Sequence, residues 1–577
     1  MYKLILLFLS SFVFFSCTQS PQEMRRIKVS DYVDKMKAGW VGQMVGVGWG
    51  GPTEFKWQGE IIPEHEMPEW QPYMVNQFNQ DDIYVEMTFL RTLEQYGFDV
   101  DIRQAGIDFA NSKYMLWHAN RAGRDNLRAG IAPPFSGHPH YNSHADDIDY
   151  QIEADYAGLI SPGLPQVAID LGETFGRLMN YGDGLYGGQF VAGMYAEAFF
   201  ESDIEKIIQA GLACIPQESQ YYEAISDVVN WYHENPDDWQ ATWELIEAKY
   251  QDNPEYRKFS CTGAESDFNI DAKINGAYIV MGLLYGQRDP DQTVIISTRC
   301  GQDSDCNPSN AAGILFTTIG FENLDEKFTS VINPEPKFSY TDYNFPGLVD
   351  VCEKLARQAV QRSGGTVETD DNGDEWFVFP VQTPQPSAFE QCWEPAPITQ
   401  DVNFTEEEMA QITMRTRKPE EFVRTWHIAG PYQQSGLTGM ELFDVTFPPE
   451  TDPSNVQWQK APVGEEGYSP NIVEFDKIYN TINAAAYMRT VFSVEKARPA
   501  TIELGSDDGV KVWLNDMLVF SKNVERGVNA ADDKVPVTLR EGTNELMLKV
   551  TQGQGGWGAV VCLVDQNGEA LTNLDFE

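Results

Sequence analysis

The hydrophobic pattern of this chain changes its period near Glu420, and this change constrains the fold more than any other feature. From Ile27 to about Gly320, apolar residues recur at helical spacing between glycine-rich breaks, with almost no strand pattern. After Glu420, apolar and polar residues alternate in short runs that glycine and aspartate turns separate. The first pattern indicates a helical core and the second an antiparallel sandwich, so we predict a multidomain α+β protein.

The chain between these two parts has a mixed character. Residues 333–419 are predicted to contain a helix, a β-hairpin and a proline-rich connection that either covers the first domain or spaces the second. A chain of 577 residues is too long for one ordinary core. We therefore expect an all-α domain over 27–332, the connection over 333–419 and a β-sandwich over 420–577.

Individual elements follow from the same two periods. Helices are predicted over 82–96, 101–118, 165–181, 185–200, 203–214, 218–233, 238–250, 271–286, 291–299 and 307–320. Strands are predicted over 423–428, 500–504, 510–520, 535–539, 544–550 and 559–564.

The first residues are typical of an export signal. A basic start is followed by an apolar run, Leu4–Phe15, that is too short to span a bilayer. Ser16 and Cys17 resemble the lipobox of a bacterial lipoprotein, which implies lipidation at Cys17. We expect a signal peptide over 1–17, a polar tether over 18–26, and a place in a bacterial cell envelope, in the periplasm or at the outer-membrane surface. A plain signal peptide with a chance cysteine is the alternative.

Charge and cysteine content exclude some classes of function. With 41 basic and 87 acidic residues, the formal charge is −46, which disfavours general nucleic-acid binding. Beyond Cys17 the cysteines follow no disulfide or zinc spacing, so no disulfide is predicted. Past that residue no long apolar run recurs, and we expect membrane contact only through a lipid anchor.

Two acidic pairs, Asp81-Asp82 and Asp303 with Asp305, lie where predicted helices begin. Helix capping alone explains an aspartate at such a position. However, both pairs lead into apolar helices, and paired carboxylates near a core repel each other unless a cation compensates. Oxygen ligands of this kind suit Mg²⁺.

A third element is the glycine-dense segment 46–55, which ends with Glu54 and Phe55. Glycines permit a tight loop that approaches a ligand or another backbone. Glu54 could then act on a bound substrate or serve as a further ligand. The alternative is a connecting loop with a solvated glutamate.

The order of these motifs resembles the ADP-ribosylglycohydrolase family. The matching features are Gly46, Gly50 and Glu54 at four-residue spacing, then Asp81-Asp82, then Gly301–Asp305, with further similarity over 148–200. The resemblance covers residues 27–320. It implies an all-α fold with a di-magnesium or di-manganese centre that hydrolyses bonds at the anomeric carbon of ribose.

The resemblance also implies roles for single residues. Metal ligands would be Asp81, Asp82, Asp303 and Asp305; Glu54 and Asp82 would be catalytic; and Gly182, Asp183, Gly184 and Asp155 would bind substrate. Gln80 and Cys306 replace hydroxyl residues of the family pattern, and Val47 replaces an aspartate. Because cysteine is a poor ligand for Mg²⁺, the sequence leaves open whether a second ion binds.

Two groups of titratable residues lie near the middle of the chain. A second acid, for the leaving group, is expected among Asp146, Asp147, Glu153 and Asp155. Four histidines, at 118, 138, 140 and 144, are interpreted as loop or surface residues outside the site.

The last domain resembles galactose-binding-like and PA14-like sandwiches, through segments 505–516 and 555–558. Trp426, Tyr432 and Trp557 would either stack on a sugar or pack in the core, of which packing is the commoner use.

Together these features predict an exported glycoside hydrolase that uses Mg²⁺ or Mn²⁺ and a metal-positioned water on a small glycoside or oligosaccharide. The alternatives are a true ADP-ribosyl hydrolase and a non-catalytic carbohydrate-binding lipoprotein.

Overall fold

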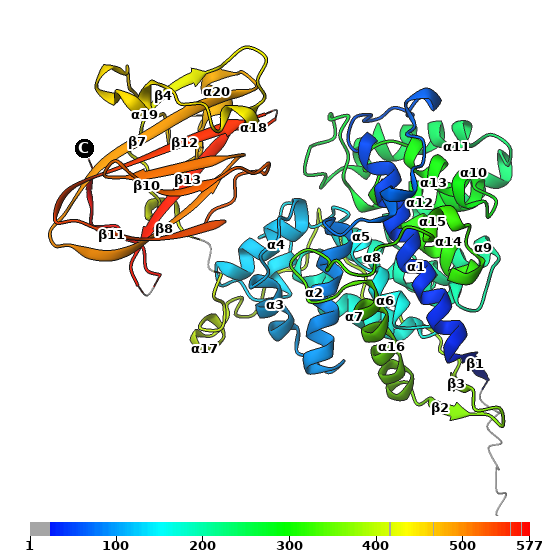
Figure 1. Cartoon of the computed structure of the whole chain (residues 1–577). Helices are drawn as coiled ribbons and strands as arrows, with labels where there is room; N and C mark the ends of the chain where they lie inside the picture. Colours follow the sequence, from blue (N-terminus) through cyan, green and yellow to red (C-terminus); the bar gives the residue numbers. More distant parts are fainter. Residues whose placement is uncertain (1–22, 415–416, 466, 554, 567, 577) are drawn as a thin grey trace, which may run out of the picture. The chain divides into compact units, whose positions relative to one another are not determined.

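The computed structural model describes residues 23–414, 417–465, 467–553, 555–566 and 568–576. The chain divides into two compact units, one up to Arg415 and one from Thr416 (Figure 1). We call them the helical unit and the sheet unit. The predicted signal peptide and Cys17 lie outside the described residues. Within the described ranges, no helix combines the length and apolar character that crossing a bilayer requires.

Within the described residues, the helical unit contains the following helices. They are α1 (Val29–Gly50), α2 (Asp81–Tyr96), α3 (Ile102–Ala110), α4 (His118–Arg128), α5 (Asp149–Ile152), α6 (Asp155–Leu159), α7 (Pro165–Phe175), α8 (Asp183–Ala198), α9 (Ile204–Leu212), α10 (Gln220–Glu234), α11 (Trp239–Ile246), α12 (Ala272–Tyr285), α13 (Pro290–Arg299), α14 (Cys306–Ile319), α15 (Glu326–Thr329), α16 (Phe345–Arg362) and α17 (Glu406–Met409).

Helices α1 and α14 form the central pair of this unit. Both are buried along most of their length. A Cβ atom at Gly42 would collide with the backbone of Ala312, and one at Gly46 would collide with the backbone of Pro308. The two helices therefore pack backbone to backbone, which brings the end of α1 close to the start of α14.

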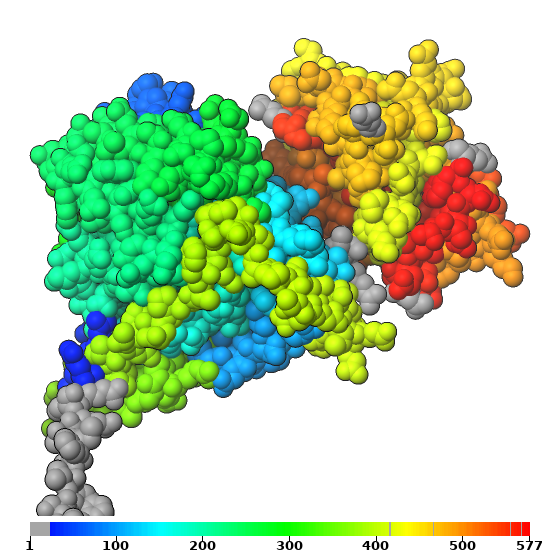
Figure 2. All heavy atoms as spheres, turned by 180° about the vertical axis from the view of Figure 1, so that it is seen from behind, coloured from blue at the N-terminus to red at the C-terminus, as the bar shows by residue number. Residues whose placement is uncertain are grey.

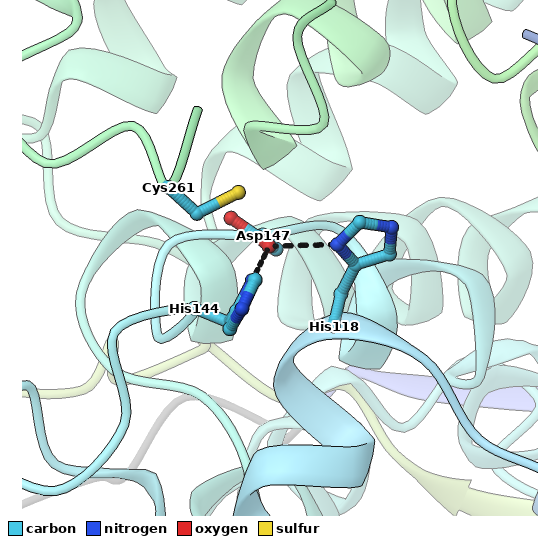
Figure 3. Close-up of side chains that lie close together, drawn as sticks. All are labelled: His118, His144, Asp147 and Cys261. Atoms are coloured by element: carbon cyan, nitrogen blue, oxygen red, sulfur yellow. Dashed lines mark hydrogen bonds and ion pairs between the residues drawn. The ribbon is translucent and has the colours of Figure 1, made fainter. Parts of the chain in front are cut away.

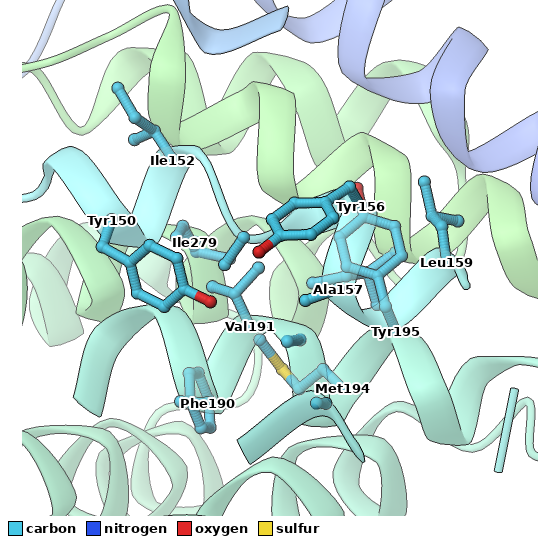
Figure 4. Close-up of a cluster of buried hydrophobic side chains, with 14 of the residues drawn as sticks. Tyr150, Ile152, Tyr156, Ala157, Leu159, Phe190, Val191, Met194, Tyr195 and Ile279 are labelled. Atoms are coloured by element: carbon cyan, nitrogen blue, oxygen red, sulfur yellow. The ribbon is translucent and has the colours of Figure 1, made fainter. Parts of the chain in front are cut away.

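A cluster of large buried side chains fills the interior around α5, α6, α8 and α12 (Figure 4). Tyr150, Tyr156, Tyr195 and Ile279 are all fully buried there. Helices α8 and α12 are apolar on most of their surface and buried along nearly all of their length, which is typical of helices at the centre of a large domain.

A small antiparallel sheet closes the helical unit at the N-terminal end of α1. Its order is β1 (Met24–Lys28), β3 (Glu375–Pro380) and β2 (Thr366–Thr369). Residues 24–26, which the sequence assigned to a tether, thus belong to a strand. Tertiary contacts hold them there: Arg25 forms an ion pair with Glu197 at 2.6 Å, and the next strand along, β3, is far away in sequence.

The proline-rich connection covers the helical unit. Tyr186 donates to the carbonyl of Ala388 at 2.7 Å, and Arg103 pairs with Glu408 at 2.6 Å. Figure 2 shows this segment as a yellow-green band across the surface of the helical unit. Of the two expectations for the connection, covering the first domain is the one observed, and residues up to 415 belong to the same compact unit.

The predicted helix over 101–118 is wrong: two helices, α3 and α4, flank a break at 111–117. The break has a tertiary cause. The side chain of Asn111 donates to the carbonyl of Gln411 at 2.9 Å and accepts from the amide of Thr413 at 2.7 Å. The sequence periodicity carries no information about such a distant partner.

The sheet unit contains two antiparallel sheets. Its elements are β4 (His427–Tyr432), α18 (Gly439–Leu442), α19 (Pro448–Thr451), β5 (Gln459–Lys460), β6 (Val473–Glu474), α20 (Phe475–Tyr479), β7 (Ala484–Val494), β8 (Arg498–Ser506), β9 (Val510–Leu514), β10 (Met517–Lys522), β11 (Asp533–Leu539), β12 (Gly542–Gln552), β13 (Gly558–Val564) and β14 (Asp575–Phe576).

One sheet has the order β10-β9-β12-β7-β4-β5, with β14 also on β7, and the other has β11-β8-β13-β6. Side chains of both sheets share one core, which contains Leu548 of β12 and Val561 of β13. Trp426 and Trp557 are buried in that core, and Tyr432 stacks on Phe447. Core packing, the commoner of the two uses, is therefore the one observed for the two tryptophans.

Two strand predictions need correction, and one long strand was not predicted. The predicted strand 510–520 is a hairpin, because Asn515 and Asp516 adopt positive φ between β9 and β10. The predicted strand 423–428 begins only at His427, since Trp426 turns back to donate to the carbonyl of Val423. Strand β7 was missed: its opening run of alanines has low strand propensity, yet it pairs with β4, β12 and β14.

We predict that Gly42→Ala destabilises the helical unit by about 1–3 kcal/mol, the usual penalty for overpacking a close contact. The added methyl would meet the backbone of Ala312, which cannot rotate away. Thermal unfolding followed by circular dichroism measures the effect. Gly51→Ala is the matched control, because a Cβ at Gly51 meets nothing within 4 Å. Equal melting temperatures for the two variants would contradict this account of the α1–α14 contact.

Candidate active site

The glycine loop after α1 lies against the segment that opens α14. A Cβ at Gly50 would collide with the carbonyl of Ser304. The hydroxyls of Thr53 and Ser304 lie 2.8 Å apart, and the amide of Phe55 donates to the carbonyl of Gln302 at 3.2 Å. These contacts hold Glu54 beside the second acidic pair.

The start of α2 completes the arrangement. The side chain of Gln43, on α1, donates to the backbone carbonyl of Asp82 at 3.1 Å, which fixes the first turn of α2 against α1. Gln80 is the N-cap of α2, and its side-chain oxygen accepts from the amide of Asp81 at 3.0 Å. Its side-chain nitrogen lies 3.4 Å from Asp305 Oδ2. The two acidic pairs, far apart in sequence, thus face each other.

A cavity of about 330 Å³ lies between these segments, within the size range of small-molecule sites. It is lined by Glu54, Phe55, Asp81, Asp82, Trp117, His118, Asn120, Ile148, Asp149, Ile152, Ile270, Asp303, Asp305 and Cys306. One part of this lining is carboxylate and the other is apolar and aromatic. None of these lining residues is a lysine or an arginine.

Helix capping does not account for the acidic residues. Gln80, and not an aspartate, caps α2, and the side chain of Asp305 makes no capping hydrogen bond to α14. Buried Oδ1 atoms of Asp82, Asp303 and Asp305 have no hydrogen-bond partner among the described residues. Such atoms are costly in a protein interior unless something else satisfies them.

The donor set fits divalent cations that prefer oxygen. Ligand atoms of Glu54, Asp303 and Asp305 lie within 4.8 Å of one another, as do those of Asp82, Asp305 and Cys306. Asp305 belongs to both groups, which is the arrangement that two neighbouring ions would use. Asp82, Asp303 and Asp305 are therefore the aspartates of these groups that could hold Mg²⁺ or Mn²⁺, and Asp81 lines the same cavity.

Burial and mutual repulsion change the acidity of these groups. Burial, reinforced by Asp305, raises the pKa of Asp81 to about 7. The pKa values of Asp82 and Asp303 rise well above the usual range for the same two reasons. Burial also raises the pKa of the Cys306 thiol, which lies 3.4 Å from Asp82 Oδ2. A neutral thiol there is a hydrogen-bond donor rather than a metal ligand.

The family model for ADP-ribosylglycohydrolase matches residues 28–365, more than half of the chain. The chain belongs to the ADP-ribosylglycohydrolase family. Membership of this family supports a hydrolase of this superfamily as the role of the helical unit. The matched range includes every residue that lines the cavity.

Three solved structures give weaker likenesses. An "ADP-ribosylglycohydrolase-related protein complex" has a TM-score of 0.36 at 12% identity and covers 57% of this chain and 99% of that one. An anti-sigma factor domain-containing protein from Clostridium clariflavum has a TM-score of 0.16 at 12% identity, covering 34% of this chain and 61% of that one. A beta-glucosidase from Kluyveromyces marxianus has a TM-score of 0.17 at 10% identity, covering 46% of this chain and 33% of that one. These TM-scores are too low to define the fold. No curated protein matched the chain.

Four residues that the family resemblance assigned to substrate lie elsewhere. Gly182, Asp183, Gly184 and Asp155 are not among the residues that line the cavity. Asp183 lies 3.9 Å from the buried ammonium of Lys273. Asp155 accepts from Asn310 at 2.7 Å inside the core. Their positions support structural roles and not direct contact with a ligand in this cavity.

The expected second acid is also placed differently. Asp146 pairs with Lys273 at 3.0 Å, and Glu153 accepts from Asn120 at 2.6 Å. Asp149, which the sequence did not single out, lines the cavity instead, and both of its oxygens accept backbone amides at the start of α4. The high density of acidic residues between 144 and 155 indicated that this segment lies at the cavity. It did not indicate which of these acids line the cavity.

The sequence did not predict that Trp117 and His118 line the cavity. The histidines were expected at the surface, and one continuous helix was expected through both residues. The break before α4 exposes Trp117 to 49% and turns His118 toward the cavity. His118 adopts a positive φ of 35°, which is uncommon for a residue with a side chain. The Trp-His pair just before a helix start was the only local signal.

We predict that removal of divalent cations makes stability fall as the pH rises from about 5 to about 8. A carboxyl whose pKa is raised in the folded state, such as Asp81, stabilises the fold at low pH and loses that contribution as pH rises through about 7. Added Mg²⁺ should remove this fall, because the ion binds the deprotonated groups. Melting temperatures with Mg²⁺ and with a chelator, measured across this pH range, test it.

The overall charge of −46 also lowers stability at high pH, so only the difference between the two profiles is informative. Asp303→Asn should shrink this difference, whereas Asp170→Asn, at an exposed position on α7, should leave it unchanged. Parallel profiles with and without Mg²⁺ in the unmodified protein would show that no cation compensates these carboxylates.

Proposed function

We propose that this protein is an exported glycoside hydrolase that uses Mg²⁺ or Mn²⁺ and cleaves a bond at an anomeric carbon. Membership of the ADP-ribosylglycohydrolase family supports a hydrolase. The observation that supports the metal and the sugar substrate is the cavity itself, where several buried carboxylates face an apolar and aromatic wall and no lysine or arginine is among the lining residues.

Asp81, Asp82, Asp303 and Asp305 would hold the ion or ions. A bound cation would supply a Lewis acid next to the substrate and lower the pKa of a coordinated water. Since Cys306 is a neutral thiol and Gln80 is used as a helix cap, neither supplies an anionic ligand. The four aspartates and Glu54 would thus provide the anionic oxygens nearest the ion or ions, while Asp149, the other lining carboxylate, accepts two backbone amides.

Glu54 is the best candidate for the general base. Its side chain is exposed, so it can exchange protons with solvent, and it lies beside Asp303 and Asp305. A carboxylate at this position could accept a proton from a water that the ion coordinates. Asp82 is 1% exposed and accepts from Cys306, which suits a ligand better than a proton carrier.

The wall of the cavity favours a neutral sugar. Trp117 and Phe55 offer aromatic surface, and Ile148, Ile152 and Ile270 offer aliphatic surface. A diphosphate group is usually bound by arginine, lysine or a helix N-terminus. Because no lysine or arginine lines this cavity, we favour a small glycoside or oligosaccharide over an ADP-ribosyl substrate.

Export is proposed from the N-terminal sequence alone. Residues 1–17 have the pattern of a lipoprotein signal, so the mature protein would be held in the cell envelope by lipid at Cys17. Substrates in that compartment would be scavenged glycosides. The two sheets of the C-terminal unit could present such carbohydrate to the enzyme, although its buried tryptophans are not available for stacking.

We predict that Glu54→Gln lowers kcat by about 10²–10⁴-fold while the metal content stays unchanged, which is the usual effect of losing a general base. Asp303→Asn should abolish turnover and reduce metal content together. Asp170→Asn is the matched control and should behave as the unmodified protein. The assay is hydrolysis of a panel of nitrophenyl glycosides by the purified protein with Mg²⁺ or Mn²⁺.

The same panel separates the alternatives. Turnover of an ADP-ribosylated peptide, without turnover of any glycoside, would identify an ADP-ribosyl hydrolase. Sugar binding that survives Asp303→Asn, with no turnover of either class, would identify a binding protein and overturn the proposal.

A further inference from the structure

A second cluster of ligand-type side chains lies beside the cavity and plays no part in the function proposed above. It consists of His118, His144, Asp147 and Cys261 (Figure 3). One ligand atom from each residue lies within 4.8 Å of all the others. His144 Nδ1 is 2.7 Å from Asp147 Oδ2, and His118 Nδ1 is 3.5 Å from the same oxygen.

The four residues come from three separate segments that the fold fixes in place. His118 begins α4, His144 and Asp147 lie in the loop before α5, and Cys261 lies in the loop before α12. Backbone pairing joins two of these segments: the amide of Ile148 donates to the carbonyl of Ile270 at 3.1 Å, and that of Ala272 donates to the carbonyl of Asp146 at 2.9 Å. The loop that carries His144 and Asp147 is therefore paired with the chain just before α12, in the same connection that carries Cys261.

Its chemistry differs from that of the acidic cavity. Two imidazole nitrogens, one carboxylate and one thiol make a mixed set of nitrogen, oxygen and sulfur donors, which suits Zn²⁺ and does not suit Mg²⁺. Asp147 is fully buried, and its Oδ1 atom has no hydrogen-bond partner among the described residues. Such an atom needs a positive partner that the neighbouring side chains do not fully supply.

We propose that His118, His144, Asp147 and Cys261 form a binding site for a single Zn²⁺ ion, separate from the Mg²⁺ or Mn²⁺ ions of the acidic cavity. This inference does not depend on the proposed function, because it rests on a different set of ligands.

A catalytic cysteine is a poorer explanation of the cluster. Burial and the neighbouring Asp147 raise the pKa of Cys261, so that its thiol is not activated as a nucleophile in the metal-free state. Asp147, and not Cys261, is the hydrogen-bonding partner of the imidazole of His144. A zinc ion would favour the thiolate by direct coordination.

The site would fix one wall of the cavity. His118 belongs to both the cluster and the cavity lining, and its ring packs against Phe268 at 5.9 Å between centroids. Phe268 in turn packs against Phe55, next to Glu54. Zinc bound to His118 and Cys261 would thus hold together the segments that carry these aromatic residues.

Replacement of zinc by Co²⁺ tests the proposal on the full-length purified protein. Co²⁺ bound by a cysteine thiolate gives a ligand-to-metal charge-transfer band in the near ultraviolet, which oxygen sites do not give. We expect about one equivalent of Co²⁺ to produce this band, at tetrahedral intensity in the visible region. Titration with Zn²⁺ should abolish the band, and a large excess of Mg²⁺ should not.

Single substitutions assign the band to its ligands. Cys261→Ser and His144→Ala should remove it and weaken Zn²⁺ binding by more than the ~10–100-fold that loss of an outer partner costs. His140→Ala, at an exposed position in the same loop, and Asp303→Asn, in the acidic cavity, should keep the band. Circular dichroism of each metal-free variant establishes that it is folded.

Two results would overturn the proposal. The first is an absence of stoichiometric Co²⁺ or Zn²⁺ binding to the folded protein, which would leave Asp147 as the centre of a hydrogen-bonded cluster only. The second is a charge-transfer band that survives Cys261→Ser, which would place the metal at another cysteine. Loss of glycosidase activity in Asp303→Asn, with the band retained, would show that the zinc site does not depend on the acidic cavity.

Discussion

The rest of the helical unit depends on the backbone contact between α1 and α14. Glycines at 42 and 46 remove the side chains that would otherwise separate these helices. Because the contact continues to Gly50, the loop that carries Glu54 meets the segment that carries Asp303 and Asp305. A side chain at any of these glycines would push apart the two halves of the candidate active site, so one packing constraint serves both stability and function.

The helical unit contains two groups of buried carboxylates, and they differ in whether a buried lysine lies among them. Asp146, Asp183 and Asp271 surround the buried ammonium of Lys273, at 3.0, 3.9 and 3.7 Å. The protein itself thus supplies one cation for these three carboxylates. No lysine or arginine lies among the residues that line the cavity, and this difference supports the proposal that an external cation compensates its carboxylates.

The helical unit also depends on contacts from segments that are remote in sequence. Strand β1 is held by β3, which comes some 350 residues later. The proline-rich connection contacts α3, α7 and α8 through the pairs Arg103–Glu408, Glu173–Ser387 and Tyr186–Ala388. The same connection ends α3, through Asn111, and so creates the break that turns Trp117 and His118 toward the cavity. The substrate wall is therefore shaped partly by chain outside the helices that bear the aspartates.

The sequence by itself determined the division into a helical and a sheet part, most helix positions, and the five acidic residues that meet at the cavity. Periodicity and paired carboxylates are local signals, and the order of the motifs identified the family. Only the tertiary structure decided that Asp183 and Asp155 face inward, that His118 lines the cavity, and that Cys261 joins two histidines and Asp147. These placements depend on contacts between segments far apart in the chain, and a pattern of neighbouring residues does not predict which distant residue each one contacts.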